Sequence, residues 1–284
     1  MYTEEIKAVS DSLSHVAAAA EHQGGGAGWI MHHILDSREL NFEPFFTIHL
    51  PELHLFGMDI SITKNVVFMW IAFALLVVIF NIVAKSYKKS FLPKGLANAV
   101  EVFVVFVKDE IAKPTIGKGY EKFLPFLLTI FFFILFCNFL GLVPYGATAT
   151  NNIAVTATLA VISFFVIQLG GIKKNGLFGY FKGLMPGGLP IALVPVIFLI
   201  EILGLFTKPF ALAVRLFANM TAGHIVIMAL IGLIFILHTY FVAPVSVAFA
   251  LFIFLLEILV ALIQAYIFTM LSSLFIGMAV HQDH

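Results

Sequence analysis

The chain has 284 residues, of which 61% are hydrophobic and only 11% charged, and its mean hydropathy is +1.04. This composition excludes an ordinary soluble globular protein. Five or six apolar runs approach the length of a bilayer-spanning helix, which favours an all-α polytopic membrane protein. The runs are continuous, so they lack the two-residue alternation of a membrane β-barrel.

Residues 1–64 form a polar N-terminal segment that we separate from a helical membrane domain over residues 65–284. The segment carries six of the ten histidines: His15, His22, His32, His33, His49 and His54. Their spacings match no zinc-binding pattern, and no cysteine accompanies them. We therefore expect a solvated, partly helical tail without a metal or a cofactor. Its first residues lack a basic stretch leading into an apolar one, so we expect no cleaved signal.

The first apolar run, Val66–Ala84, has the length of one membrane span. Leu96–Val107 is too short to cross and has lysines on both sides, so we place it in the interface. The positive-inside rule puts those lysines in the cytoplasm and the N-terminal segment outside. Phe123–Val143 then crosses outward, and Asn152–Gly170 returns. Gly176–Pro190 is rich in glycine and proline and is typical of a cytoplasmic loop.

The last part of the chain contains two apolar runs of 49 and 40 residues, Leu189–Leu237 and Phe241–Val280. As straight helices they would measure roughly 73 and 60 Å, against a bilayer core of about 30 Å. Four ordinary spans would need turns at membrane depth, where the sequence has no turn residues. We predict two long, strongly tilted helices that form an antiparallel hairpin over residues 189–280, with a kink at Pro195 or Pro209. The total is about five crossing helices plus one interfacial helix.

Few ionisable residues occur inside this hairpin. Glu201, Lys208 and Arg215 recur every seven residues and therefore share one face of the first long helix. His224 follows Arg215 by nine residues, about 900° round the helix and roughly 13.5 Å along it, so it lies on the opposite face. Arg215 cannot shed its proton, and an ionised side chain at the bilayer centre costs about 2.5–3.5 kcal/mol. A functional role for Arg215 is the default interpretation.

On the second long helix, Glu257 and Gln264 share a face. If His224 faces Glu257 across the antiparallel hairpin, Gln264 lies nearly level with Arg215, and Asn219 lies one turn from Arg215. An acid paired with a histidine reduces the desolvation cost of both groups and can relay protons. Because the hairpin loop faces outside, the pair lies between the exterior and Arg215. This order indicates half of an ion pathway that ends at a fixed cation.

At these residues the chain resembles the subunit a family of the F-type ATP synthases, the ion-translocating stators of the membrane sector. The resemblance rests on five stretches: Lys208-Pro209, Arg215-Leu216-Phe217-Ala218-Asn219-Met220, Ala222-Gly223, Glu257, and Gln264-Ala265-Tyr266-Ile267-Phe268. The order of segments agrees from about residue 66 to the end. Three features depart from common patterns of the family: Ala211 replaces a small hydroxyl residue, Asn151-Asn152 stands where an acid is frequent, and the acid and the histidine are exchanged between the helices, as in some members.

The resemblance implies ion translocation, with the proton as the first expectation, through two half-channels beside a rotating ring of c subunits. Arg215 would face the carboxylates of that ring. His224, Glu257, Asn219 and Gln264 would line the pathway, and Asn138 and Glu201 match further polar positions of the family. It also implies b subunits of a peripheral stalk as partners, the rest of the complex, a bacterial inner membrane and coupling to ATP synthesis. No cofactor, metal or catalytic site of the chain's own is implied.

Other interpretations stay open from sequence alone. Arg215 could pair with Glu201, although roughly 21 Å separates them along a straight helix. His224 and Glu257 could be a structural pair, Asn219 and Gln264 could join helices, and Lys208 could extend to an interface. A secondary transporter or channel subunit with its own intramembrane site is the main alternative function, but the repeated halves of such a transporter are absent from the sequence. A self-contained enzyme is disfavoured because neither a phosphate loop nor an H-E-x-x-H motif occurs.

Overall fold

The computed structural model describes residues 39–42, 46–51, 54–55, 58–59, 61–89, 94–143, 146–183, 194–237 and 241–281. Of the N-terminal histidines, His15, His22, His32 and His33 lie outside these residues. The described part of the N-terminal segment is extended, where we expected a partly helical tail. Strand β1 (Glu39–Phe42) pairs with β2 (Phe46–His49), and β3 (His54–Leu55) pairs with β4 (Met58–Asp59), each pair antiparallel.

The pairing of β1 with β2 explains why this stretch is a hairpin. Leu40 lies opposite Ile48, and Phe42 lies opposite Phe46. In each strand the apolar positions recur with the two-residue period that is typical of a strand. Among the described residues, no group of three or more His, Cys, Asp or Glu side chains is arranged to hold a metal ion.

In the part of the chain that the structure describes, five helices are long and apolar enough to cross a membrane. They are α3 (Lys64–Lys89), α6 (Leu124–Gly141), α7 (Ile153–Gly183), α8 (Val194–Leu237) and α9 (Ala243–Val280). The predicted all-α membrane architecture and its five crossing helices are confirmed.

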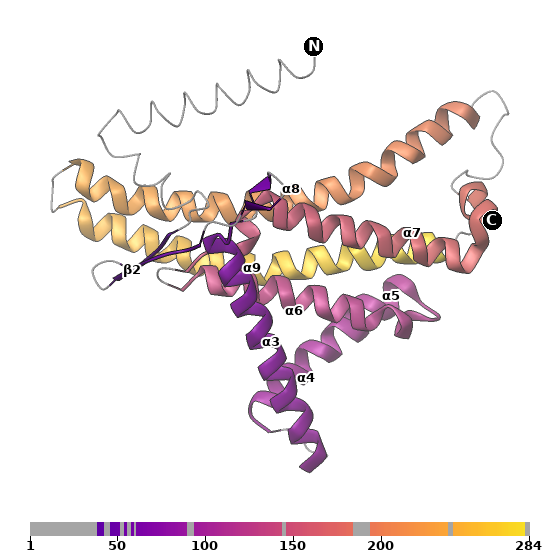
Figure 1. Ribbon diagram of the computed structural model, residues 1–284, viewed down its shortest axis with the longest axis horizontal. Helices are drawn as coiled ribbons and strands as arrows, with labels where there is room; N and C mark the ends of the chain where they lie inside the picture. Colours follow the sequence, from indigo (N-terminus) through magenta and orange to yellow (C-terminus); the bar gives the residue numbers. More distant parts are fainter. Residues whose placement is uncertain are drawn as a thin grey trace.

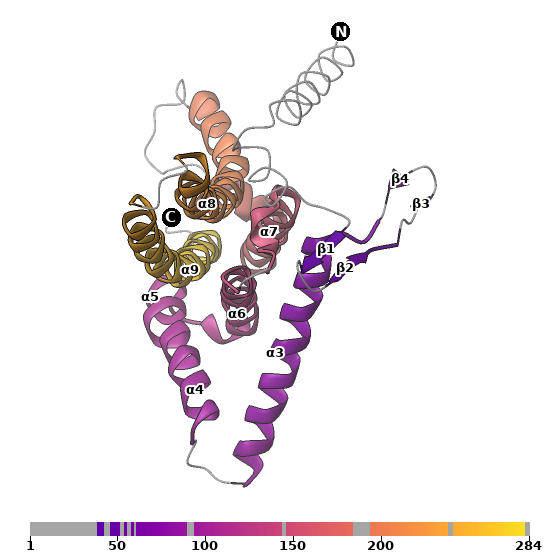
Figure 2. The same cartoon turned by 90° about the vertical axis from the view of Figure 1, so that its left-hand side faces the viewer.

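The five helices do not stand parallel to one another. Figure 1 shows α7, α8 and α9 running side by side across the upper end of α3. In Figure 2 the helices α6 to α9 are seen nearly end-on, whereas α3 and α4 are seen from the side. The helices of the last half therefore cross α3 steeply. Their tilt relative to a membrane stays a prediction.

The interfacial segment is longer than predicted. Helix α4 (Leu96–Phe106) continues without a break through a π-helical turn η1 (Val107–Ala112) into α5 (Lys113–Ile116). The π turn lets the helix keep one side buried as it passes the core, since Val107, Ile111 and Ala112 are fully buried. The whole helical segment from α4 to α5 is not among the five candidate spans, so its position in the membrane interface remains our prediction.

Helix α7 extends beyond the predicted span Asn152–Gly170 and overlaps the predicted cytoplasmic loop. Gly176, with φ +73, breaks it into two pieces, and the second piece reaches Gly183. The second piece packs back against the first through Tyr180, whose ring is buried and whose hydroxyl donates to Gln168 Oε1 at 2.6 Å. Gly171 makes room for that ring, since a Cβ there would come within 2.5 Å of it. Residues 184–193 lie outside the described part.

The two long helices of the C-terminal hairpin are continuous, as predicted, with no turn at their middles. Helix α8 begins at Val194, so Pro195 occupies the first turn, where its missing N–H interrupts no hydrogen bond. Pro209 is inside α8, which is visibly bent in Figure 1. An interior proline removes one helical hydrogen bond, which accounts for such a bend.

The core lies where α6, η1, α8 and α9 meet. Its largest fully buried side chains include Phe131 and Ile134 of α6, Leu216 of α8, and Phe268 and Ile276 of α9. Elsewhere large apolar side chains remain exposed along the helices, as expected for surfaces that face lipid or partner subunits.

Candidate functional site

His224 on α8 and Glu257 on α9 form the central contact of the site. His224 Nδ1 lies 2.7 Å from Glu257 Oε1, and the side chains are 20% and 2% exposed. The predicted pairing across the hairpin is confirmed. Gly223 permits this close approach, because a Cβ at that position would lie 3.1 Å from Glu257 Oε1.

The second oxygen of the Glu257 carboxyl is also buried. Among the residues that the structure describes, Oε2 has no hydrogen-bond partner. Buried polar atoms are nearly always paired, so an unpaired carboxyl oxygen marks a position of chemical interest. It leaves the carboxyl one oxygen that can take up a proton without breaking the contact with His224.

Asn219 and Gln264 form a second polar contact across the same two helices. Asn219 Nδ2 donates to Gln264 Oε1 at 2.9 Å, and Gln264 is 1% exposed. Helical spacing predicted that Gln264 lies nearly level with Arg215. In the structure Gln264 instead contacts Asn219, one turn further along α8. The His224–Glu257 register of the antiparallel pair explains this, because it puts Gln264 between the levels of Arg215 and Asn219.

Asn138 on α6 joins this polar group from a third helix. It is fully buried, accepts a hydrogen bond from Thr150 Oγ1 at 2.6 Å, and donates to the carbonyl oxygen of Ala261 at 3.4 Å. Ala261 lies one turn from Glu257 on α9. The prediction that Asn138 belongs near the pathway residues therefore agrees with its contacts, while its role in transport is untested by them.

Two residues of the site were missed by sequence reasoning. Thr221 Oγ1 donates to Asn151 Oδ1, which links the short 3₁₀ helix η3 (Ala149–Asn151) to α8 one turn from His224. In the sequence, Asn151 stands out only as a departure from a family pattern. A usable signal was present in the spacing, since Thr221 precedes His224 by three residues and so lies on the same side of α8.

Arg215 lies on the other side of α8. Its side chain is exposed, and within the described part of the chain it makes no hydrogen bond or ion pair, including with Glu201. The alternative of a structural Arg215–Glu201 pair is therefore wrong for the described residues. Glu201 is half-buried and also stays apart from the His224–Glu257 group. Lys208, by contrast, places its Nζ 5.4 Å from the ring centroid of Phe275.

The surface of α8 around Arg215 is made of small side chains. Ala211, Ala218 and Ala222 are all exposed and follow the i, i+4, i+7, i+11 spacing of a single helix face together with Arg215. Small residues let a second helix approach closely. The geometry thus separates the His224–Glu257 contact on one face of α8 from an exposed cation on another, for which the described residues supply no hydrogen bond or ion pair.

Comparison with known proteins agrees with this arrangement. The family model described as "ATP synthase A chain" matches residues 66–277. The chain is 60% identical over 261 residues to the ATP synthase subunit a of Chloroherpeton thalassium, covering 89% of this chain and 77% of that protein.

Two further relatives cover still more of the chain. It is 57% identical to an ATP synthase subunit a of Prosthecochloris aestuarii, over 95% of this chain and 86% of the relative. It is 52% identical to that of Pelodictyon phaeoclathratiforme, over 99% and 85%. The chain therefore belongs to the ATP synthase A chain family, the ion-translocating subunits of the ATP synthase membrane sector.

Proposed function

We propose that this chain carries protons between the outside and a rotating ring of c subunits through two half-channels, and that Arg215 separates the two. The observation that carries the proposal is that Arg215 is exposed on an alanine-lined face of α8 and that the described residues give it no hydrogen bond or ion pair. An arginine at bilayer depth needs an anion. Since none of the described residues supplies one, a carboxylate of a neighbouring subunit is the partner that fits.

The outer half-channel runs along the polar contacts between α8, α9 and α6. The His224–Glu257 pair receives the proton, because a neighbouring imidazole and carboxyl can exchange one without creating an isolated buried charge. Asn138, Gln264 and Asn219 continue the pathway towards the level of Arg215. Glu201, further along the Arg215 face, belongs to the inner side of the pathway.

Arg215 acts by charge alone. A protonated rotor carboxyl can enter lipid, whereas its ionised form costs several kcal/mol there. The permanent guanidinium stabilises the ionised form as it passes, and it repels a proton that would cross directly between the half-channels. Each charge that moves through the membrane potential supplies about 2.3 kcal/mol per 100 mV, which turns the ring and drives ATP synthesis elsewhere in the complex.

The orientation follows from the lysines. We place Lys85, Lys88 and Lys94 in the cytoplasm by the positive-inside rule. The N-terminus is then outside, the C-terminus is cytoplasmic, and the membrane is the bacterial inner membrane. Subunits b of a peripheral stalk hold the chain against the torque of the ring.

The test compares Arg215→Ala with Lys208→Ala, which removes the other cation of the same helix face. Inverted membrane vesicles containing the assembled complex are assayed for ATP synthesis driven by an imposed proton gradient. Arg215→Ala should assemble normally and lose synthesis, while Lys208→Ala should retain most of it. Normal synthesis in Arg215→Ala would refute the proposed role.

A further inference from the structure

A cavity of about 650 Å³ lies away from the His224–Glu257 group, where the start of α6, the middle of α7 and the end of α9 meet. Its eleven lining residues come from these helices and from the loop and 3₁₀ turn η2 (Tyr120–Lys122) that precede α6. Gly170 of α7 lets the ring of Phe123, the residue before α6, pack closely against α7, because a Cβ at Gly170 would meet that ring at 3.0 Å.

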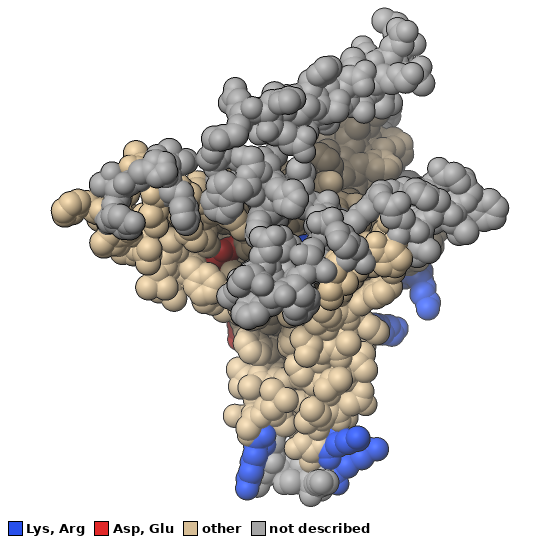
Figure 3. All heavy atoms as spheres, turned by 60° about the vertical axis from the view of Figure 1, so that its left-hand side comes forward, with Lys and Arg blue, Asp and Glu red and all other residues tan. Residues whose placement is uncertain are grey.

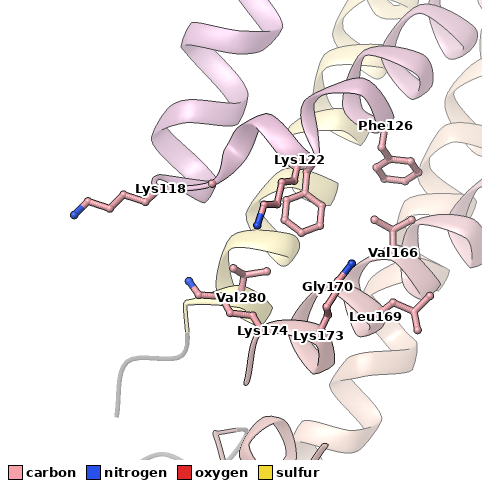
Figure 4. Close-up of a pocket in the computed structure, with 11 residues that line it drawn as sticks. Lys118, Lys122, Phe126, Val166, Leu169, Gly170, Lys173, Lys174 and Val280 are labelled. Atoms are coloured by element: carbon pink, nitrogen blue, oxygen red, sulfur yellow. The ribbon is translucent and has the colours of Figure 1, made fainter. Parts of the chain in front are cut away.

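The charge of the lining is entirely positive. Lys118, Lys122, Lys173 and Lys174 line the cavity, and none of its eleven lining residues is acidic. Figure 4 shows the Lys122 and Lys173 side chains converging on the cavity from opposite walls. Figure 3 shows that Lys and Arg side chains gather at the edges of the molecule, as they do at the ends of membrane spans.

One wall is held in place by a pair of contacts to His281, the residue after α9. His281 Nε2 lies 3.2 Å from the carbonyl oxygen of Lys118, and its Nδ1 lies 3.0 Å from Lys174 Nζ. Both contacts are satisfied at once if Nε2–H donates to that carbonyl and Nδ1 accepts from the ammonium. Lys174 is thereby fixed at the rim beside the end of α9.

The rest of the lining is apolar. Phe123 and Phe126 of the α6 start, Val166 and Leu169 of α7, and Val280 of α9 form it, and Leu169 is 62% exposed. The basic rim lies where α6 begins, at the end of a membrane span, and the apolar residues continue along α6 and α7 into the span. A free anion would use only the rim, whereas a lipid would use both parts.

We propose that this lysine cavity binds an anionic phospholipid, with its phosphate between Lys122 and Lys173 and its acyl chains on the Phe126 and Leu169 surface. Basic pockets at the cytoplasmic ends of membrane helices suit anionic headgroups because the lysines act as point charges on phosphate. The bound lipid would contact α6, α7 and α9 at once and so stabilise the packing of these three helices. This site goes beyond the proposed proton pathway and does not depend on it.

The experiment uses the assembled complex in nanodiscs that contain phosphatidylcholine and a small fraction of phosphatidylglycerol with a photoactivatable acyl chain. Labelling should fall on the segments around Phe126 and Leu169, and Lys122→Gln/Lys173→Gln should reduce it by about 25-fold, since each of the two lysines contributes about fivefold to anionic-lipid binding. The control is Lys85→Gln/Lys88→Gln, which removes two lysines that do not line the cavity; it should label as the wild type does.

Two outcomes would overturn the proposal. One is equal labelling by a photoactivatable phosphatidylcholine, which would mean that charge plays no part. The other is unchanged labelling in Lys122→Gln/Lys173→Gln. The variant Lys122→Arg/Lys173→Arg keeps the charge and should keep the labelling, so a general loss of folding is distinguishable from loss of the site. ATP synthesis is not the readout, so failure here leaves the proton-pathway proposal unaffected.

Discussion

Removing one partner of the His224–Glu257 pair tests the outer half-channel most directly. In His224→Ala the Glu257 carboxyl, 2% exposed, loses its only hydrogen bond among the described residues, because Oε2 already has none. Breaking a buried charged pair from one side costs about 3–5 kcal/mol. If the carboxyl avoids that cost by staying protonated, it no longer releases protons.

The free-energy cost of breaking the pair can be converted into an expected loss in the rate of proton transfer. About 1.4 kcal/mol corresponds to a factor of ten, so 3–5 kcal/mol corresponds to a loss of roughly two to three and a half orders of magnitude in proton transfer. The assay is ATP-driven proton pumping in inverted vesicles, normalised to the amount of assembled complex. His224→Ala and Glu257→Ala should both fall near the detection limit.

The exchange variant His224→Glu/Glu257→His separates pairing from position. It restores an acid–histidine contact across α8 and α9, so it should pump faster than either single variant. Recovery will be partial, because the larger imidazole must fit at position 257 beside Gly223, where the present carboxyl already leaves little room. Equal losses in the exchange variant and both single variants would refute direct pairing.

Three further predictions concern the surroundings of this pair. Gly223→Ala would place a Cβ 3.1 Å from Glu257 Oε1, which requires a shift of a few tenths of an ångström, and should keep part of the pumping activity. Gly223→Val adds two further methyl groups to that Cβ and should abolish pumping; equal pumping by both variants would contradict this. Asn138→Leu leaves the buried Thr150 hydroxyl without its partner and should lower the free energy of unfolding by about 1–3 kcal/mol, measured by denaturant titration; an unchanged free energy of unfolding would contradict this. Ala218→Trp should stop ATP synthesis without affecting insertion if this face meets the rotor, whereas Val78→Trp on exposed α3 should not; full synthesis in Ala218→Trp would exclude a close rotor contact there.

The contacts inside the hairpin could be predicted because the sequence offers so few polar residues there. His224 and Glu257 each need a partner in an apolar environment, and helical periodicity leaves one antiparallel register that brings them together. The same register places Gln264 within one turn of Arg215, and its actual partner, Asn219, lies in that turn. Desolvation made these pairings predictable.

Contacts that come from loops and irregular backbone could not be predicted in this way. Asn151 belongs to a 3₁₀ helix whose direction is set by packing, so helical spacing indicates the side of α8 on which Thr221 lies but does not identify Asn151 as its partner. The π turn Val107–Ala112 and the folding back of α7 at Gly176 likewise depend on the surfaces they meet. The β-hairpin at Leu40–Ile48 has strands of only four residues, which is too short for the alternation of apolar and polar residues to predict a strand.

The two faces of α8 give the proposed function its physical basis. Arg215 and His224 are separated by about two and a half helical turns. Arg215 is exposed and has no hydrogen bond or ion pair among the described residues, whereas His224 contacts Glu257. In the proposed mechanism, a proton that reaches Glu257 therefore does not pass Arg215 along a single face of the helix but leaves on a group of the rotor. The small alanine side chains on the Arg215 face of α8 would let such a group pass closely. If α8 were rotated so that Arg215 joined the His224 face, the separation of the half-channels would be lost and the gradient would dissipate without turning the ring.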